Sequence, residues 1–167
     1  MDIKTLRTAL GRIPSCVCIV STVDADGSPV CMTANSIVPV AAATPRLLWS
    51  LGRESRSRAA FERARCFGVT VLAAHQQHVA RQMASPVTDR FAGVDWFGGR
   101  LTGVPLIAQS IARLECAKVT WREVGDHITF MGEVAGAEYG EGLQPLLYVN
   151  GRYAALATGS LAMERFG

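Results

Sequence analysis

Residues 110–139, SIARLECAKVTWREVGDHITFMGEVAGAEY, hold the pattern that decides the fold. Two long β-rich runs, 110–124 and 127–139, are separated only by Gly125 and Asp126. A two-residue connection can join only antiparallel neighbours, and glycine suits a turn position because it tolerates positive φ. The segment therefore predicts a long antiparallel β-hairpin.

Shorter β-rich runs lie on both sides of this hairpin. They cover residues 16–23, 29–35, 46–51, 67–72 and 145–149. Hydrophobic spacing and capping residues also predict helices over 3–13, 55–64 and 75–83, and residues 85–99 form a long predicted loop. Six or seven strands linked mainly by hairpins, with few helices and no glycine-rich βαβ unit, predict a mainly antiparallel β-barrel.

The composition limits the kind of molecule. With 167 residues, the chain is expected to form one domain over residues 1–167. Its net charge of +3 is too small to indicate nucleic-acid binding. No apolar run approaches the ~18 residues of a membrane span. The hydrophobic content of 49% and mean hydropathy of +0.20 are high for a small monomer and favour a subunit interface.

Two features favour a cytoplasmic location. The first residues, MDIKTLRTALGRIP, lack the apolar core of a signal peptide. Of the five cysteines, Cys31, Cys66 and Cys116 lie in apolar contexts and Cys16 and Cys18 would share one face of a strand. Their spacing is not that of a metal site, so we expect buried, reduced thiols and no metal site. His75 and His78 form H-x-x-H on a predicted helix, but no third ligand lies nearby in the sequence, and a solvated helix face is the simpler interpretation.

A polar cluster stands at the start of the predicted helix over residues 55–64, which Ser55 would cap. It consists of Ser55, Arg56 and Ser57, with Ser50 and Leu51 just before it. Backbone N–H groups and the helix dipole attract anions at such a position, and hydroxyl and guanidinium donors add charge-assisted bonds to phosphate. An ordinary serine N-cap with solvated arginines is the alternative interpretation.

A second polar cluster, Thr33, Ala34, Asn35 and Ser36, ends a predicted strand. An asparagine side chain and backbone amides there could hydrogen-bond the edge of a flat heterocycle, which carries both donors and acceptors. A simple strand-ending turn would use the same residue types. The two clusters together, about 20 residues apart, indicate a ligand site more specifically than either does alone.

His127 follows the turn of the long hairpin. A neutral imidazole donates from one nitrogen and accepts at the other, so this position suits ligand recognition. An exposed turn histidine without a ligand is the alternative. No G-x-S-x-G motif accompanies it, which argues against an activated serine nucleophile.

The motifs of the chain resemble those of the short-chain flavin reductases of two-component monooxygenases. That family carries R-x-A-L-G-R-x-P, D-G-x-P-x-x-M-T-A-N-S, S-L-x-x-x-S-R-S, F-A-G-V-D-W, a G-D-H hairpin and P-L-x-Y-x-x-G-R-Y. The corresponding segments here are 7–14, 26–36, 50–57, 91–96, 125–127 and 145–153. The resemblance spans nearly the whole chain and keeps the order and spacing of the motifs.

The resemblance implies a split-barrel fold, that is, a Greek-key antiparallel β-barrel with a few flanking helices. It also implies a homodimer in which NADH or NADPH reduces FMN or FAD, and the reduced flavin then leaves for a partner flavin-dependent monooxygenase. By the same resemblance, His127 faces the nicotinamide. The flavin-binding residues would be Thr33, Ala34, Asn35, Ser36, Ser50, Leu51, Ser55, Arg56, Ser57, Phe91 and Tyr153.

The chain departs from the family pattern at three places. Ser15-Cys16 replaces a Thr-Gly pair, residues 39–45 lack the usual serines, and Thr70 stands where asparagine is common. These changes leave the choice between FMN and FAD open. Two other functions also remain open: a flavoprotein with tightly bound FMN that reduces a corrin or a quinone, and a flavin-binding module without turnover.

Overall fold

The computed structural model describes residues 2–41 and 43–156. The elements are, in chain order, α1 (Ile3–Leu10), β1 (Ser15–Cys16), β2 (Cys18–Val23), β3 (Pro29–Ala34), β4 (Val38–Ala41), β5 (Arg46–Gly52), α2 (Arg58–Arg63), β6 (Cys66–Val71), the 3₁₀ helix η1 (Ala74–Gln76), α3 (Gln77–Ala84), β7 (Trp96–Gly98), β8 (Pro105–Ile107), β9 (Ala112–Val124), β10 (His127–Tyr139), β11 (Leu147–Val149) and β12 (Arg152–Ala154).

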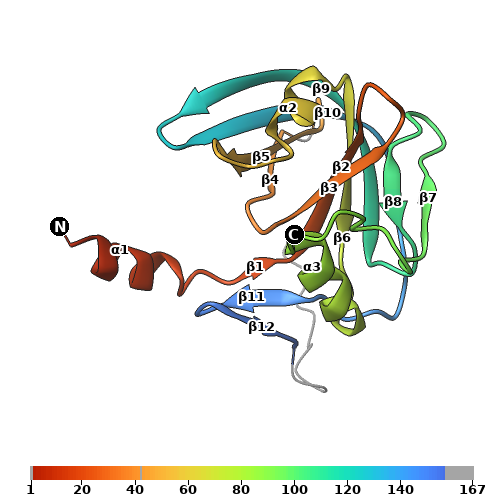
Figure 1. Ribbon diagram of the computed structural model, residues 1–167. Coiled ribbons are helices and arrows are strands. Elements are labelled where there is room, and N and C mark those ends of the chain that lie inside the picture. Colours follow the sequence, from red (N-terminus) through yellow and green to blue (C-terminus); the bar gives the residue numbers. More distant parts are fainter. Residues whose placement is uncertain (1, 42, 157–167) are drawn as a thin grey trace.

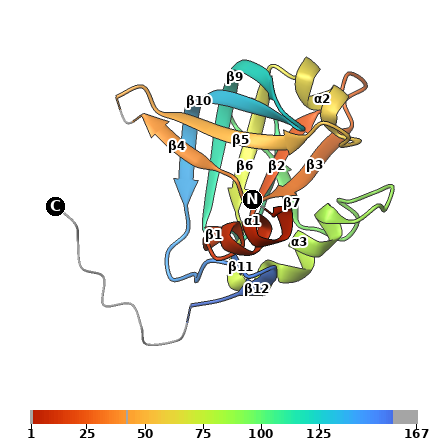
Figure 2. The ribbon, with the colours of Figure 1, turned by 90° about the vertical axis from the view of Figure 1, so that its left-hand side faces the viewer.

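Within these residues, seven antiparallel strands form one sheet in the order β3-β2-β6-β9-β10-β5-β4. The sheet curls, and its two edge strands are consecutive in the chain, joined only by residues 35–37 (Figure 2). Register shifts in β10, at Met131/Gly132 and Val134/Gly136, add bend and twist to the central hairpin. The predicted antiparallel barrel is therefore confirmed, in its half-open form.

Aromatic rings fill the interior of the curled sheet. Trp49 is fully buried and stacks on its cross-strand partner Phe130, with ring centroids 4.5 Å apart. Phe61 of α2 and Phe67 of β6 meet the Trp49 ring edge-on, at 4.8 and 5.8 Å. Gly132 permits this packing, because a β-carbon there would overlap the Phe67 ring. Four separate elements are thus fastened to one cluster.

A second layer covers part of the outer face of the sheet. α3 packs against β3, and the β7–β8 hairpin packs against β2 and β6. A second apolar cluster forms there, which includes Ile19, Met83, Phe91, Ile107 and Leu146. The small sheet β1-β11-β12 lies beneath, and α1 stands away from the barrel at the end of the β1 segment (Figure 1).

The structure corrects several predicted boundaries. Helix α1, capped by Asp2, ends at Leu10 instead of Ile13, because Gly11 closes it and the chain turns. The predicted helix from Ser55 begins only at Arg58, since residues 52–57 form a turn whose Arg53 N–H bonds the Asp126 carbonyl at 2.9 Å. The predicted loop 85–99 contains β7, whose partner β8 was missed because both strands are only three residues long.

The cysteines are free, as expected, but not all are buried. Burial raises the pKa of Cys18 to about 12 and that of Cys31 to about 11, which keeps both thiols protonated. Cys16 is exposed, against the expectation, because it lies in the two-residue strand β1 outside the barrel. Among residues 2–41 and 43–156, no group of three metal-ligating side chains gathers, and no helix is long and apolar enough to cross a membrane.

Glu115 holds the β7–β8 connection against β9. Its carboxylate, 8% exposed, accepts hydrogen bonds from the Thr102 N–H (2.6 Å), the Thr102 hydroxyl (2.7 Å) and the Leu101 N–H (3.0 Å). Burial raises the pKa of Glu115, but the hydrogen bonds from Thr102 and Leu101 outweigh it, and the net pKa lies below the ordinary 4.5. The ionised carboxylate therefore stabilises the folded state.

We expect Glu115→Gln to lower the free energy of unfolding by about 1.5–3 kcal/mol at neutral pH, the usual size for hydrogen bonds to a charged group. The folded pKa is lowered, so this contribution is complete above the unfolded pKa of 4.5 and is lost as the pH falls through the folded value. Urea unfolding of the wild-type protein and of Glu115→Gln at neutral and acidic pH measures the difference in their free energies of unfolding. Glu138→Gln, at an exposed glutamate, is the control. An equal difference in the free energy of unfolding at both pH values would contradict a stabilising role of the ionised Glu115 carboxylate.

Candidate functional site

Polar side chains line the outer face of β5 and β10, where the two strands pair. Ser50 and Thr129 are cross-strand partners with their hydroxyl oxygens 3.1 Å apart. The Ser36 hydroxyl accepts a hydrogen bond from the Ser50 N–H at 3.3 Å. His127 lies on the same face of β10 as Thr129, two residues away. We call Ser36, Ser50, Thr129 and His127 the polar strip.

His127 is an exposed residue of the strip, with 52% of its side chain accessible. Its Nδ1 lies 2.7 Å from the Asp126 carboxylate, and this hydrogen bond is the main cause of the lowered pKa of Asp126. An ionised carboxylate only accepts, so the Nδ1 atom carries the proton. The Nε2 atom of a neutral ring is then an acceptor directed away from Asp126.

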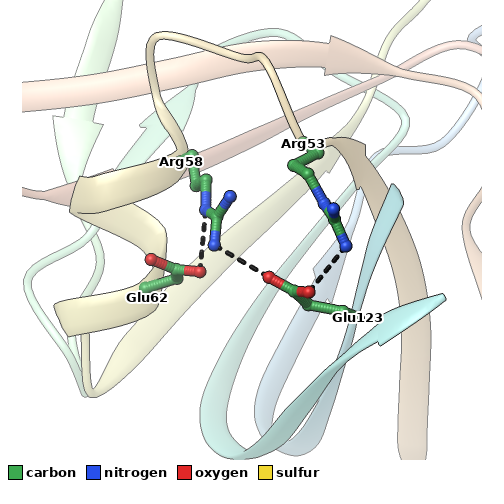
Figure 3. A network of polar contacts seen from close by, with 4 residues as sticks. All are labelled: Arg53, Arg58, Glu62 and Glu123. Atoms are coloured by element: carbon green, nitrogen blue, oxygen red, sulfur yellow. Dashed lines mark hydrogen bonds and ion pairs between the residues drawn. The ribbon is translucent and has the colours of Figure 1, made fainter. Parts of the chain in front are cut away.

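Charged side chains fix the turn over residues 52–57 beside the strip. The Glu123 carboxylate bonds Arg53 at 2.6 Å and Arg58 at 3.0 Å, and Arg58 also bonds Glu62 at 2.9 Å (Figure 3). The pairs are partly exposed, so each contributes only a modest amount of stability. As a network they tie the tip of the β9–β10 hairpin to the start of α2 and position the turn that carries Ser55 and Arg56.

Ser57 joins this turn to the edge strand β3. Its buried hydroxyl donates to the Cys31 carbonyl at 3.3 Å. Arg90, from the loop after α3, donates to the same carbonyl at 2.6 Å and to the Ser57 hydroxyl at 3.4 Å. The Ser57 hydroxyl thus has protein partners, while Ser55 is half-buried and Arg56 is exposed with one 3.3 Å bond to the Pro86 carbonyl.

In the predicted corner at residues 33–36, two residues make contacts inside the fold and two are exposed to solvent. The Thr33 hydroxyl donates to the Ala80 carbonyl of α3 at 2.7 Å, and Ala34 is buried in the barrel. Asn35 and Ser36 are exposed. The structure brings this corner to the 50–57 segment through the bond between Ser36 and Ser50, as the sequence predicted.

Three other predicted site residues have their side chains mainly in packing. Leu51 is 1% exposed as a whole residue and packs inside the barrel. Phe91 is 6% exposed in the second apolar cluster and contacts the Trp96 ring at 5.2 Å. Tyr153 is half-buried against Tyr148, at 5.5 Å between ring centroids.

Sequence reasoning missed Thr129 and Arg90. Thr129 follows His127 by two residues in a predicted strand, so the period of two could have placed both on one face. Arg90 stands directly before Phe91, but 33 residues separate it from Ser57, and nothing local in the sequence indicates that contact.

The residues present suit a flavin. The strip and the corner offer hydroxyl, amide and imidazole groups, and the Arg56 guanidinium can pair with a phosphate. Beside Arg56 and Ser57 opens a cleft of about 700 Å³, bounded by the β2–β3 turn, α2 and the loop before Phe91. We call it the arginine cleft. Among residues 2–41 and 43–156, β3 is an edge strand with no neighbouring strand on one side, and it adds backbone N–H and C=O groups there.

Comparisons with known proteins agree with this geometry. The model of the flavin reductase like domain family matches residues 10–157. A probable flavin reductase of Rhizobium meliloti is 38% identical over 152 residues, 91% of this chain but only 48% of that protein. The chain thus spans about half the length of this relative. The reductase subunit of a flavin-dependent monooxygenase from Rhodococcus jostii is 34% identical, over 93% of this chain and 79% of that one.

Among solved structures, the NADH:FAD oxidoreductase of Streptomyces globisporus in complex with NAD and FAD fragments superimposes with a TM-score of 0.89. The two sequences are 34% identical, and the match covers 95% of each chain. Fold, sequence and family model therefore point the same way. The chain belongs to the flavin reductase like domain family and has its split-barrel fold.

Proposed function

We propose that this protein is an NAD(P)H-dependent flavin reductase that reduces FMN or FAD and supplies the reduced flavin to a partner monooxygenase. The observation that carries the proposal is the near-complete match to an oxidoreductase whose structure holds NAD and FAD fragments. The match to a monooxygenase reductase subunit supports the class of partner. A bound flavin supplies the hydride-accepting ring; the protein supplies binding and orientation.

The flavin is proposed to lie along the corner and along the part of the polar strip formed by Ser36, Ser50 and Thr129. Asn35 and Ser36 are exposed there and offer an amide, a hydroxyl and backbone groups to a heterocycle edge. Ser50 and Thr129 supply hydroxyls for the polar chain that links ring and phosphate. Ser55 and Arg56 hold the phosphate, because Arg56 brings an exposed guanidinium to that end.

His127 is proposed to orient the nicotinamide. With its Nδ1 proton held by Asp126, its Nε2 atom is free to accept from the carboxamide N–H₂ group of the coenzyme. Hydride transfer itself needs no general base, so the role of His127 is to place the donor ring. The exposed position at the hairpin tip leaves room for a coenzyme that binds and leaves in each cycle.

We propose that the protein is a homodimer in the cytoplasm. All residues of α1 are exposed when only the described part of the chain is considered, among them Ile3 at 67% and Leu10 at 55%. Ile13, just after the helix, is 64% exposed. An apolar helix face of this kind is stable when a second subunit covers it. The five free thiols suit a reducing compartment, where NADH is also available.

The proposed function is tested by oxidation of NADH and NADPH, each with FMN, FAD and riboflavin. We expect steady turnover with added free flavin, at a rate that follows flavin concentration. Oxidation of a single equivalent that depends on tightly bound flavin would favour a prosthetic flavin that reduces another substrate. Flavin binding without any oxidation of either coenzyme would leave a non-catalytic binding module.

Replacing His127 tests its role separately. We expect His127→Ala to raise the NADH KM and lower kcat/KM by about tenfold to a hundredfold, which equals about 1.4–2.7 kcal/mol of transition-state stabilisation. The flavin Kd should stay within about twofold, since other residues hold the flavin. His78→Ala, also at an exposed histidine, is the matched control. Normal NADH kinetics in His127→Ala would contradict a role of His127 in orienting the nicotinamide.

Light scattering at micromolar concentration tests the dimer. We expect a mass of about twice the 17.9 kDa chain, because a stable interface buries more than ~1,000 Å². Leu10→Glu should shift the mass toward the monomer, whereas Thr8→Glu on the same exposed helix should not. A monomeric wild-type protein that still binds flavin would contradict the proposal.

A further inference from the structure

A second pocket lies between the β7–β8 hairpin and the outer face of the β9–β10 hairpin. Its volume is about 320 Å³, at the lower end of the range of small-molecule sites. We call it the Arg113 pocket. Its main lining residues are Phe97, Arg100 and Leu101 from the β7–β8 hairpin and Arg113, Glu115 and Glu138 from the sheet.

The register of the β9–β10 hairpin forms the floor of this pocket. Arg113 and Glu115 stand two residues apart in β9, so they share one face, and their cross-strand partners in β10 are Glu138 and Gly136. A β-carbon at Gly136 would come within 2.7 Å of the Leu101 Cδ1 atom. The glycine therefore lets Leu101 approach the strand closely and close one side of the pocket.

Arg113 is largely buried, yet its guanidinium group is poorly satisfied. Only 16% of the side chain is accessible. Its bonds to the Ser110 hydroxyl and to the Glu138 carboxylate measure 3.3 and 3.4 Å, longer than the usual 2.7–3.2 Å. The Nε atom is buried, and no described residue accepts a hydrogen bond from it. Because buried donors are normally paired, this guanidinium group is suited to a further acceptor.

The orientation of the Arg113 guanidinium group is fixed by its surroundings. It stands over the Phe97 ring, 5.6 Å from the centroid, and the Ser110 hydroxyl that it bonds is itself held by the Ile107 carbonyl at 2.9 Å. A planar fork of donors fixed in this way matches the two oxygens of a carboxylate.

We propose that the Arg113 pocket binds a small organic carboxylate with a flat apolar body, of about the size of benzoate. The ligand carboxylate replaces that of Glu138 beside Arg113, and the apolar body lies against Phe97 and Leu101. The inference does not rest on the proposed reductase function.

The two glutamates of the pocket differ in how readily they give way to a ligand. Glu115 is held by Thr102 and Leu101, so its oxygens are already occupied. The Glu138 side chain is 51% exposed and makes only the long bond to Arg113, and an ion pair of this kind contributes little stability. A ligand carboxylate can therefore displace Glu138 at small cost.

The charges around the pocket favour a monoanion. Arg100 is exposed and lines the pocket together with Arg113, which gives two guanidinium groups. With Glu138 displaced, they face the Glu115 carboxylate and one ligand carboxylate, and the charges balance. A phosphate dianion would leave an excess of negative charge beside Glu115.

The rest of the lining suits an apolar ring. Phe97 is 38% exposed and Leu101 is 63% exposed, and the side chain of Leu106 is buried beside them. Large apolar side chains that remain exposed beside a guanidinium group offer contact area to a ligand body, which acetate lacks.

The Arg113 pocket is separate from the proposed flavin and coenzyme sites. Trp96 lines the arginine cleft, whereas its neighbour Phe97 lines the Arg113 pocket, and the described linings of the two share no residue. The β7–β8 hairpin also lies on the opposite side of the molecule from α1, the helix proposed to contact a second subunit (Figure 1).

The test is isothermal titration calorimetry of the full chain with benzoate, with its uncharged analogue benzamide and with acetate, each with and without saturating FMN. The variants are Arg113→Met and Glu138→Gln. Arg65→Met, at an exposed arginine outside the lining, is the matched control. Thermal unfolding shows whether each variant is folded, and light scattering gives its mass.

We expect benzoate to bind with a Kd of about 1 mM or lower, and benzamide and acetate at least about tenfold more weakly. Arg113→Met should weaken benzoate at least about tenfold, because hydrogen bonds to a charged group are lost. Glu138→Gln should tighten it about two- to fivefold, because the competing carboxylate is gone. Arg65→Met and added FMN should leave the benzoate Kd unchanged.

The opposite responses of the two variants separate a ligand site from a structural arginine. If Arg113→Met does not fold, Glu138→Gln still decides, since its side chain is exposed: an unchanged or weaker benzoate affinity would overturn the inference. Absence of benzoate binding, or equal binding of benzamide, would also overturn it. Competition between benzoate and FMN would assign benzoate to the flavin site, and a change of mass in folded Arg113→Met would assign Arg113 to a subunit interface; either result contradicts the proposal.

Discussion

The stack of Trp49 on Phe130 is the contact on which the rest of the structure depends. The two residues are cross-strand partners in β5 and β10, so the stack also fixes the register of that pairing. Phe61 and Phe67 add edge contacts from α2 and β6, which draws the sheet into a curl. Aromatic pairs contribute about 0.5–1.5 kcal/mol beyond their burial, and here one indole collects three of them.

The register of the β5–β10 pairing determines which residues form the polar strip on the outer face of the barrel. Because side chains alternate along a strand, burying Trp49 and Phe130 turns Ser50 and Thr129 to the outer face, where their hydroxyls meet at 3.1 Å. A slip of one residue would bury the polar partners and expose the rings. The same alternation places His127 outside. The apolar core and the candidate flavin site are therefore two faces of one strand pairing.

Much of the fold was predictable from local patterns. The β9–β10 hairpin, most of the other strands and the helix after residue 75 follow from alternation, turn residues and hydrophobic spacing. The predicted start of α2 was wrong because Ser55 and Ser57 are the same residue type and either can precede a helix. The choice between them depends on hydrogen bonds that involve the distant Asp126 and Cys31. The strands β7 and β8 were missed because three-residue strands carry too little pattern.

The sequence by itself determined the barrel class, the family and which segments carry the polar site, since strand period, turn residues and motif spacing are written along the chain. Only the tertiary structure decided which of the polar side chains are accessible and which are used in internal hydrogen bonds. Thr33 and Ser57 carry suitable hydroxyls, yet Ala80 and Cys31 carbonyls accept them, while Arg90 reaches Ser57 across 33 residues. Hydrogen-bond partners at such separations depend on how packed layers meet, and no local pattern encodes that.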